Sequence, residues 1–387
     1  MMDILTFYDA KFLSEPLSLN LMMKPIGSVC NLRCKYCYYI DKISQYGKSN
    51  PIMSLESLEI CIEKFLEINE TNEITFNWHG GEPLLLGLDY FEKIIEFQNK
   101  YRGNINVHNT LQTNATLLTP DFARFFKDNA FLLGVSIDGP MDIHDRYRSD
   151  NNGKSSFYDV MKGIALLHRF NVDFNTMTTI NKASEGRGAD VYLFLKQIGS
   201  HYMQFMPVCE YDANSLPTDY SVDPLAYGQF MCDIYDIWKK YDIGRYFVNL
   251  FDSTLANYCS MPNGLCSYSE LCANNVVVEF NGDLYPCDHF VFPKYKIGNV
   301  FKDPLKQIFR SQQLMDFRIN KRNSLPQKCF ACRYFKTCYG GCPKHRSTAS
   351  YPNNTSHYSL CEGIFLFNSY VENDMIQMRN DICYTNS

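Results

Sequence analysis

Residues 30–37 read Cys30-Asn31-Leu32-Arg33-Cys34-Lys35-Tyr36-Cys37. The three cysteines of this run, spaced C-x3-C-x2-C, offer a metal cluster three protein ligands. Iron–sulfur clusters are normally held by four thiolates, so a cluster in this loop would keep one iron open. An open coordination position is typical of a metal site that carries out chemistry. A structural zinc site is the alternative, but such sites usually pair C-x2-C elements and have a fourth ligand near by.

The composition indicates a globular protein whose cysteines bind metal. The chain has 387 residues, 45% of them hydrophobic, and this length predicts two domains. With a net charge of −5 the chain has no excess of basic residues, so we do not expect nucleic acid as a partner. The sequence has no long apolar run and no secretory N-terminus, so we expect a cytoplasmic protein without a membrane partner. Because the cytosol is reducing, the sixteen cysteines are expected to be metal ligands and not a disulfide framework.

Short apolar segments alternate with amphipathic ones from about residue 17 to residue 208. This βαβα rhythm predicts an α/β fold with a parallel sheet and crossover helices. The expected strands are Leu17–Pro25, Glu73–Trp78, Ile105–Leu111, Phe131–Ile137, Val172–Ile180 and Tyr202–Val208. Ser54 is expected to cap a helix that places Cys61 in the core. Six strand–helix units are too few for a closed eight-fold barrel.

Polar residues gather where these strands end, and in parallel barrels function gathers at the carboxyl ends of the strands. The first strand leads to the three-cysteine loop. The next ends are Trp78-His79-Gly80-Gly81-Glu82-Pro83, Gln112-Thr113-Asn114 and Ser136-Ile137-Asp138-Gly139-Pro140, and the sixth strand carries Gln204. Each of these runs, taken alone, has the residue types that are typical of a turn. Their joint placement after successive strands favours a shared site.

Changes in composition predict three regions. Residues 1–221 contain the strand–helix units, and residues 222–262 are interpreted as a helical linker with Pro224–Tyr241 as its clearest helix. Residues 263–387 have dense cysteines and weaker periodicity. We therefore expect the second domain to begin near residue 263.

The C-terminal region carries eight candidate ligands. They are Cys266, Cys272, Cys287, Cys329, Cys332, Cys338, Cys342 and Cys361. Eight thiolates complete two four-thiolate sites, although two zinc ions would satisfy the same count. Asn281-Gly282, between Val276–Phe280 and Asp283–Tyr285, predicts a hairpin whose second strand leads into Cys287 and Asp288.

The three-cysteine loop, with an aromatic residue before its last cysteine, resembles the signature of the radical S-adenosylmethionine (SAM) superfamily. The resemblance implies a partial (β/α)6 TIM barrel and a [4Fe-4S] cluster on Cys30, Cys34 and Cys37, whose open iron binds SAM. The C-terminal cysteines resemble the cysteine-rich SPASM domain of radical SAM maturases, which implies two further [4Fe-4S] clusters, three in all. The interleaved topology of that domain assigns Cys266, Cys272, Cys287 and Cys342 to one auxiliary cluster, and Cys329, Cys332, Cys338 and Cys361 to the other.

Further stretches resemble the anaerobic sulfatase-maturating enzymes. They are Tyr285-Pro286-Cys287-Asp288-His289-Phe290-Val291, Lys296-Ile297-Gly298-Asn299, Gly340-Gly341-Cys342-Pro343-Lys344-His345-Arg346 and Leu360-Cys361-Glu362-Gly363. That family oxidises an active-site Cys or Ser of a sulfatase to Cα-formylglycine. The resemblance implies that Asp288 is the catalytic base. It also implies that SAM is contacted by Tyr36, Gly80, Gly81, Glu82, Ser136, Arg148 and Met203.

His79 departs from the pattern of this family. It precedes Gly80-Gly81-Glu82, where sulfatase maturases usually carry a Gln that contacts the substrate. We expect His79 and Tyr39 to face the substrate. Because His-Gly-Gly-Glu-Pro is common among maturases of ribosomally made peptides, crosslinking or epimerisation of a precursor peptide is the alternative function. A non-catalytic electron-transfer or zinc scaffold is disfavoured, since it has no use for an open three-cysteine site.

The resemblance also predicts the partners. The substrate would be an unfolded or nascent sulfatase, or a precursor peptide, and the reducing partner a protein such as flavodoxin or ferredoxin. The sequence leaves open whether the target residue is Cys or Ser. Five cysteines are left without a cluster: Cys61, Cys209, Cys232, Cys259 and Cys383.

Overall fold

A sheet of ten strands, in the order β10-β9-β8-β1-β2-β3-β4-β5-β6-β7, organises the fold. The structure is a computed structural model that describes residues 12, 14–40, 42, 51–214, 216–347 and 357–384. Six neighbouring strands run parallel: β1 (Asn20–Lys24), β2 (Glu73–Trp78), β3 (Asn106–Thr113), β4 (Leu132–Ser136), β5 (Phe174–Ile180) and β6 (Tyr202–Pro207). These are the six predicted strands, with ends shifted by a few residues. The expected α/β partial barrel is therefore confirmed.

Helices lie between the strands and cover the outside of the sheet. They are α2 (Leu55–Ile68), α3 (Leu88–Tyr101), α4 (Pro120–Asp128), α5 (Met141–Tyr147), α6 (Phe157–Phe170), α7 (Gly188–Gln197) and α8 (Pro224–Tyr241), with short 3-10 turns η2 (Pro83–Leu86) and η3 (Lys182–Ser184). Ser54 caps α2 as predicted, because its hydroxyl accepts a hydrogen bond of 3.1 Å from the amide of Ser57. Cys61 is fully buried on the inner face of this helix.

The C-terminal region consists of short elements and one long helix. Its strands are β7 (Phe247–Val248), β8 (Asn275–Glu279), β9 (Asp283–Tyr285), β10 (Gly298–Asn299), β11 (Arg346–Ser347) and β12 (His357–Tyr358). Its helices are α9 (Asn249–Tyr258), α10 (Leu305–Phe309), α11 (Gln312–Asn323), α12 (Gln327–Phe330), α13 (Phe335–Cys338) and α14 (Cys361–Tyr384), and its 3-10 turns are η4 (Cys266–Tyr268), η5 (Asp288–Phe290), η6 (Pro293–Tyr295) and η7 (Pro343–His345). The predicted hairpin is present as β8 and β9, which pair antiparallel.

The C-terminal elements continue the barrel sheet at both ends. On one side β8 pairs parallel with β1, which places Glu279 opposite Lys24. On the other side β7 pairs with β6, so the segment expected to be a helical linker also contributes a strand. A strand of two residues is too short to show a period-two pattern in the sequence.

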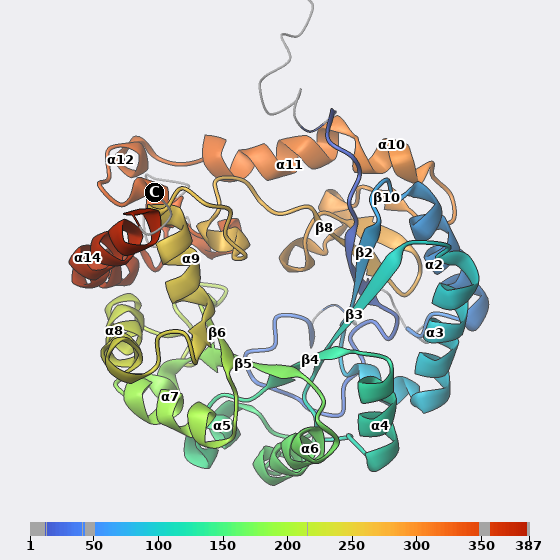
Figure 1. Cartoon of the computed structure of the whole chain (residues 1–387), viewed down its shortest axis with the longest axis horizontal. Coiled ribbons are helices and arrows are strands. Elements are labelled where there is room, and N and C mark those ends of the chain that lie inside the picture. Colours follow the sequence, from blue (N-terminus) through green and yellow to red (C-terminus); the bar gives the residue numbers. More distant parts are fainter. Residues whose placement is uncertain are drawn as a thin grey trace, which may run out of the picture.

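Figure 1 shows the helices from α2 to α8 around the right, lower and left sides of the strands, with α10, α11 and α12 across the top. Helix α14 lies beside α8, and two glycines allow close contact. A Cβ on Gly363 would lie 1.8 Å from the carbonyl oxygen of Pro224, and a Cβ on Gly228 would lie 2.3 Å from the carbonyl oxygen of Gly363. Because α14 begins at Cys361, this contact fixes a predicted cluster ligand against the barrel.

Among the helices of the described residues, none has an apolar stretch long enough to cross a membrane.

Candidate functional site

The three-cysteine loop follows β1 at the carboxyl ends of the parallel strands. The Cys30 thiol accepts a hydrogen bond of 3.3 Å from the amide of Leu32. Burial raises the pKa of Cys30 to about 12, and the nearby groups of Glu82, Cys34 and Cys37 raise it further. Burial likewise raises the pKa of Cys34 to about 11, again with a contribution from Cys37. All three thiols lie in one short loop, and a shared cluster on them stays a prediction.

Two glycines after β2 support this loop. Gly80 has a φ of +132°, a backbone conformation that favours glycine. A Cβ on Gly81 would lie 1.8 Å from the carbonyl oxygen of Val29, so the turn runs directly against the backbone of the cysteine loop. The amide of Glu82 donates a hydrogen bond of 2.8 Å to that same oxygen. The strand-two turn and the cysteine loop are therefore one packed unit.

The carboxylate of Glu82 is fully buried in this unit. It accepts hydrogen bonds from the amide of Leu84 at 3.0 Å, the hydroxyl of Thr113 at 2.8 Å and the amide of Asn114 at 2.7 Å. Burial raises the pKa of Glu82 to about 7, and these donors oppose the rise. Since a carboxylate has roughly four acceptor positions, one remains for a cationic ligand such as an ammonium group.

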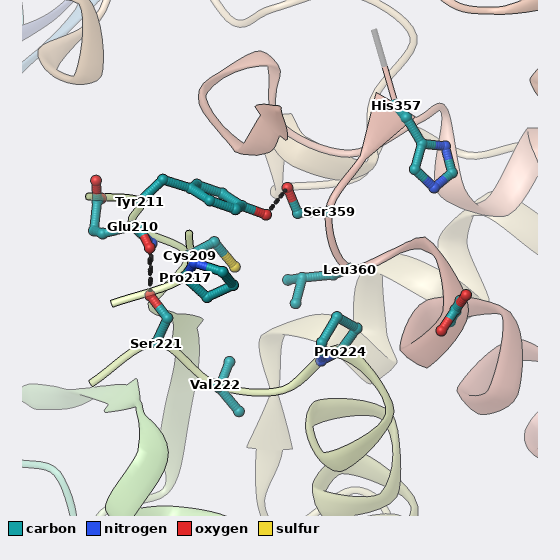
Figure 2. Close-up of a pocket in the computed structure, with 11 residues that line it drawn as sticks. Cys209, Glu210, Tyr211, Pro217, Ser221, Val222, Pro224, His357, Ser359 and Leu360 are labelled. Atoms are coloured by element: carbon teal, nitrogen blue, oxygen red, sulfur yellow. Dashed lines mark hydrogen bonds between the residues drawn. The ribbon is translucent and has the colours of Figure 1, made fainter. Parts of the chain in front are cut away.

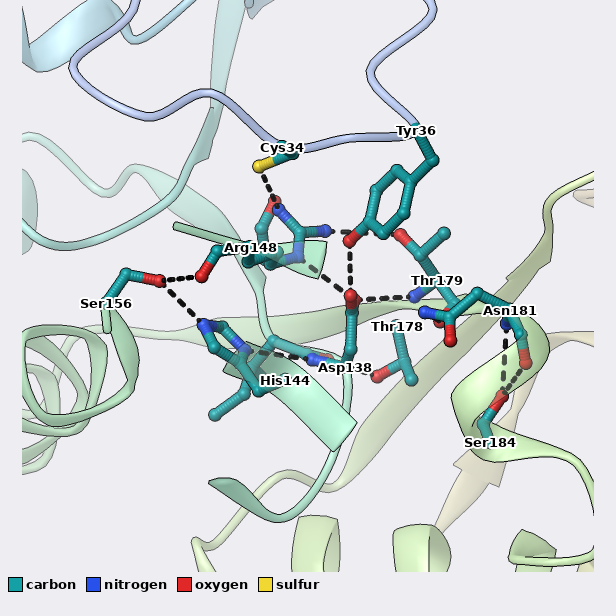
Figure 3. A network of polar contacts seen from close by, with 12 residues as sticks. Cys34, Tyr36, Asp138, His144, Arg148, Ser156, Thr178, Thr179, Asn181 and Ser184 are labelled. Atoms are coloured by element: carbon teal, nitrogen blue, oxygen red, sulfur yellow. Dashed lines mark hydrogen bonds and ion pairs between the residues drawn. The ribbon is translucent and has the colours of Figure 1, made fainter. Parts of the chain in front are cut away.

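Asp138, just after β4, is the centre of a buried polar network shown in Figure 3. It forms an ion pair of 3.1 Å with Arg148 and accepts hydrogen bonds from the amide of Thr179, at 3.0 Å, and from the hydroxyl of Tyr36. Arg148 in turn donates to the Cys34 sulfur at 3.9 Å. Asp138 thus connects two of the predicted SAM contacts to the cysteine loop.

The other two predicted SAM contacts lie on strands: Ser136 is the last residue of β4, and Met203 is the second residue of β6. The hydroxyl of Ser136 accepts a hydrogen bond of 2.9 Å from Gln112 on β3. Met203 is buried on the same face of β6 as Phe205, whose ring packs against Phe230 of α8. Because side chains alternate along a strand, the Met203 side chain faces the helices, and only its backbone is available to a ligand inside the barrel.

Asp288 directly follows Cys287, after the β8–β9 hairpin. One carboxylate oxygen accepts a hydrogen bond from the Tyr38 hydroxyl, and the other lies 3.7 Å from the Cys287 sulfur. Burial disfavours the charged form, but His289, Lys24 and the Tyr38 hydrogen bond outweigh it and hold the pKa of Asp288 well below its usual range. The side chain is therefore an ionised carboxylate.

Of the two residues expected to face the substrate, His79 lies near enough to Asp288 for their charges to interact, whereas Tyr39 is linked to Asp288 through Tyr38. Tyr39 is buried and donates a hydrogen bond to Glu279. His79 accepts a hydrogen bond of 2.7 Å at Nδ1 from the amide of Gly80. Burial lowers the pKa of His79 to about 4, and the charge of Lys24 lowers it further. The ring is neutral at physiological pH, and because Nδ1 is an acceptor, we assign its proton to Nε2.

The eight C-terminal thiols fall into two groups. In the first group burial raises the pKa of Cys272 to about 11 and that of Cys342 to about 12, and Cys266 raises both further. The pKa of Cys287 is raised by burial and by Cys342 and Cys266. In the second group, in which burial is again the largest cause, Cys329 raises the pKa values of Cys338 and Cys361, and Cys332 raises those of Cys329 and Cys361. These contributions run within the two sets that the SPASM resemblance implies, and the assignment of the thiols to two clusters stays a prediction.

Four of the five remaining cysteines have described side chains. Cys61, Cys209 and Cys232 are buried, and burial raises the pKa of each, as expected for core thiols. Cys259 is partly exposed at the end of α9. The side chain of Cys383 lies outside the described residues.

A cavity of about 150 Å³ lies apart from the predicted site. Figure 2 shows its wall, where the Tyr211 hydroxyl donates a hydrogen bond of 3.0 Å to Ser359. Leu360 and Glu362, on either side of Cys361, also line it. The cavity shares no lining residue with the predicted SAM, substrate or cluster residues.

The structure gives roles at this site to several further residues. Lys24 and Glu279 are fully buried, and Tyr38 and Asp138 bind the predicted base and the predicted SAM contacts. Lys24 and Glu279 each had a signal in the sequence, because each directly follows an apolar strand segment: Met22-Met23-Lys24 and Val277-Val278-Glu279. A charge at the end of a buried strand is costly unless it is partnered.

Comparisons with known proteins agree with this geometry. The family described as the radical SAM superfamily matches residues 25–195, and the family described as an iron-sulfur cluster-binding domain, SPASM, matches residues 269–333. A serine-type anaerobic sulfatase-maturating enzyme of Bacteroides thetaiotaomicron is 40% identical over 94% of this chain and 92% of its own. A cysteine-type enzyme of Clostridium novyi is 34% identical over 93% of this chain and 96% of its own.

Solved structures give the same result. Native anSMEcpe with bound AdoMet and the Cp18Cys peptide has a TM-score of 0.85 at 30% identity, covering 94% of this chain and 99% of that one. Streptococcus suis SuiB bound to S-adenosylmethionine has a TM-score of 0.64 at 15% identity, covering 91% of this chain and 79% of that one. At that identity the second likeness concerns the fold alone.

Proposed function

Because the chain belongs to the anaerobic sulfatase-maturating enzymes, radical SAM proteins with a SPASM domain, we propose that it oxidises an active-site Cys or Ser of a sulfatase to Cα-formylglycine. The observation that carries this proposal is the position of Asp288. It is an ionised carboxylate, held at one oxygen by Tyr38 and directly adjacent to a predicted cluster ligand, Cys287. Geometry of this kind is the first requirement for a general base.

The thiol groups fit three [4Fe-4S] clusters. We propose that Cys30, Cys34 and Cys37 hold the cluster with the open iron, and that the two groups of four hold the auxiliary clusters. When bound, SAM and the reduced cluster supply the radical chemistry that removes a hydrogen from the target Cβ, a step beyond any side chain. The glycine turn at Gly80 and Gly81, together with the acceptor position left on Glu82, favours a ligand that carries an ammonium group.

We propose that Asp288 takes the proton from the target Sγ or Oγ. Tyr38 holds one of its oxygens, and the other, which lies 3.7 Å from the Cys287 sulfur, would face the substrate once that sulfur binds iron. Because Asp288 follows Cys287, the proton leaves at the position where an electron-accepting cluster would be bound. His79 fits the same site, since a neutral ring with its proton on Nε2 is a hydrogen-bond donor, like the amide of the Gln that relatives usually carry.

The remaining expectations are part of this proposal. An unfolded or nascent sulfatase segment would be the protein substrate, and a small redox protein such as flavodoxin or ferredoxin would supply electrons in the cytoplasm. The domain ranges remain 1–221, 222–262 and 263–387.

The proposal is tested with purified protein reconstituted with iron and sulfide without oxygen. The substrate is a sulfatase-derived peptide with a C/S-x-P-x-R stretch, prepared once with Cys and once with Ser at the target position. We expect a mass loss at that residue and trapping of the aldehyde by a hydrazide probe. Formation of 5′-deoxyadenosine without any aldehyde from either peptide would contradict the proposed substrate.

A further inference from the structure

Lys24 and Glu279 form a pair of opposite charges beneath the proposed base. They are paired residues on the neighbouring parallel strands β1 and β8, and both are fully buried. The strand of Lys24 leads to the three-cysteine loop, and the hairpin of Glu279 leads to Cys287 and Asp288. The pair therefore lies where the barrel joins the cysteine-rich region.

Both charged residues contact Tyr39, and Lys24 also lies near Tyr38. The Lys24 ammonium lies 3.5 Å from the ring centroid of Tyr39 and 5.9 Å from that of Tyr38, within the range of cation–π attraction. Glu279 accepts the hydroxyl hydrogen bond of Tyr39. The rings of Tyr38 and Tyr39 pack edge to face with their centroids 6.0 Å apart, and the Tyr38 hydroxyl donates a hydrogen bond to Asp288.

Stability of the fold does not explain why these two charged residues are buried. Among the described residues, neither the Lys24 ammonium nor the second oxygen of Glu279 has a hydrogen-bond partner. Burial lowers the pKa of Lys24 and raises that of Glu279, although each partly offsets the shift of the other. Two buried charges are costly, and apolar residues of similar volume usually serve stability at least as well.

We propose that Lys24 and Glu279 are positioning residues, which hold Tyr39 and Tyr38 in place and thereby orient the carboxylate of Asp288. This inference rests on the proposed function, because it assigns a role to Asp288 in proton transfer. Lys24 holds the face of Tyr39, Glu279 holds its hydroxyl, and Tyr39 supports Tyr38 at the edge of its ring. Neither charged residue needs to touch the substrate.

The decisive variant is the double substitution Lys24→Met and Glu279→Met, which replaces both charges with apolar groups of similar volume. We expect full iron content, an unchanged KM for SAM, and a yield of formylglycine per 5′-deoxyadenosine that falls by about 10- to 100-fold, the usual cost of misplacing a reacting group. A crystal structure of this variant should show the Tyr38 hydroxyl displaced from Asp288. Lys24→Met alone should lose at least as much yield.

Lys64→Met is the matched control. Lys64 also joins the barrel to the C-terminal region, with a hydrogen bond of 2.9 Å to the carbonyl of Val300, but has no contact with the tyrosines. It should keep the normal yield per 5′-deoxyadenosine. A double variant with normal yield would overturn the inference. So would loss of iron or of folding in the double variant, because the pair would then be structural.

The wild-type protein, assayed alongside, separates the two proposals. If it makes no formylglycine, the proposed function fails. If it makes formylglycine and the double variant does so equally well, the function stands and the role of Lys24 and Glu279 is refuted.

Discussion

At the scale of single residues, Asp288 has one carboxylate oxygen on the Tyr38 hydroxyl and the other beside the Cys287 sulfur. Asp288→Asn keeps the shape of the side chain but removes its ability to accept a proton. We expect formylglycine formation to fall by about 10²–10⁴-fold, the usual contribution of a general base, while SAM cleavage is largely kept. The measurement is the ratio of aldehyde to 5′-deoxyadenosine in single-turnover assays. Iron and sulfide must be counted, since Cys287 is adjacent, and near-normal aldehyde from an intact variant would remove Asp288 from the mechanism.

Asp138 gives a second prediction at this scale. Asp138→Asn leaves the buried guanidinium of Arg148 without its carboxylate, and breaking a buried ion pair costs about 3–5 kcal/mol. We expect the free energy of unfolding to fall by that amount and the affinity for SAM to fall roughly tenfold or more, since about 1.4 kcal/mol of lost positioning corresponds to tenfold.

The control for this variant is Asp142→Asn, because Asp142 pairs with Arg187 at 2.6 Å on the surface. Exposed pairs are worth about 0–1 kcal/mol, so that variant should bind SAM normally. Equal effects of the two substitutions, measured by denaturation and by SAM titration, would refute a special role for the Asp138 network.

At the scale of elements, the contact between α8 and α14 depends on glycine. A Cβ on Gly363 meets the backbone of Pro224 at 1.8 Å, and backbone cannot move aside cheaply. Gly363→Ala should therefore destabilise the protein by about 1–3 kcal/mol and loosen Cys361, lowering iron content. Gly264→Ala is the matched control, since Gly264 is also two residues from a predicted ligand and its Cβ would meet no atom within 4 Å. Thermal unfolding and iron analysis should separate the two variants, and equal behaviour would contradict the packing argument.

The sequence predicted the elements of the barrel well, because each has a strong local signal. The helix capped by Ser54 begins as predicted, and the strand Glu73–Trp78 begins and ends as predicted. The pairing of β8 with β1 could not be predicted in this way. The two strands lie about 250 residues apart in the chain, and their contact depends on tertiary folding for which no local pattern exists.

The residues of the candidate site show the same difference between local signals and tertiary contacts. The cysteines, Glu82 and Asp288 are visible in the sequence because their residue types and spacings carry chemistry of their own. Lys24 and Glu279 have lone charges as their only signal, and Asp138 is visible only as one residue of a polar strand end; their roles arise from partners elsewhere in the fold. Met203 shows the reverse limit, since the resemblance implies a SAM contact while its buried side chain faces the helices.

At the scale of the whole molecule, the sheet that links the barrel to the cysteine-rich region places the radical-forming loop and the Cys287–Asp288 segment on one side of the sheet. Strand β1 ends in the three-cysteine loop, and its neighbour β8 leads through the hairpin to Cys287. The hydroxyl of Tyr38, which directly follows that loop, donates a hydrogen bond to Asp288. We therefore infer that radical formation and proton transfer are built on a common support, while the second thiol group, around Cys361, is attached through α14.

This arrangement predicts that each of the three thiol groups binds its own cluster independently of the other two, although the complete reaction needs all three. Cys34→Ala removes a ligand from the open cluster alone, so iron content should fall by about one third, because one of three four-iron clusters is lost. SAM cleavage should be abolished. Cys338→Ala should lower iron by about the same share through the second auxiliary group, yet keep SAM cleavage, since the three-cysteine loop and the Asp138 network are untouched. Iron and sulfide analysis with 5′-deoxyadenosine assays checks both variants. Undiminished SAM cleavage by the Cys34→Ala protein, or loss of all iron from either variant, would show that the thiols are not divided into these three groups.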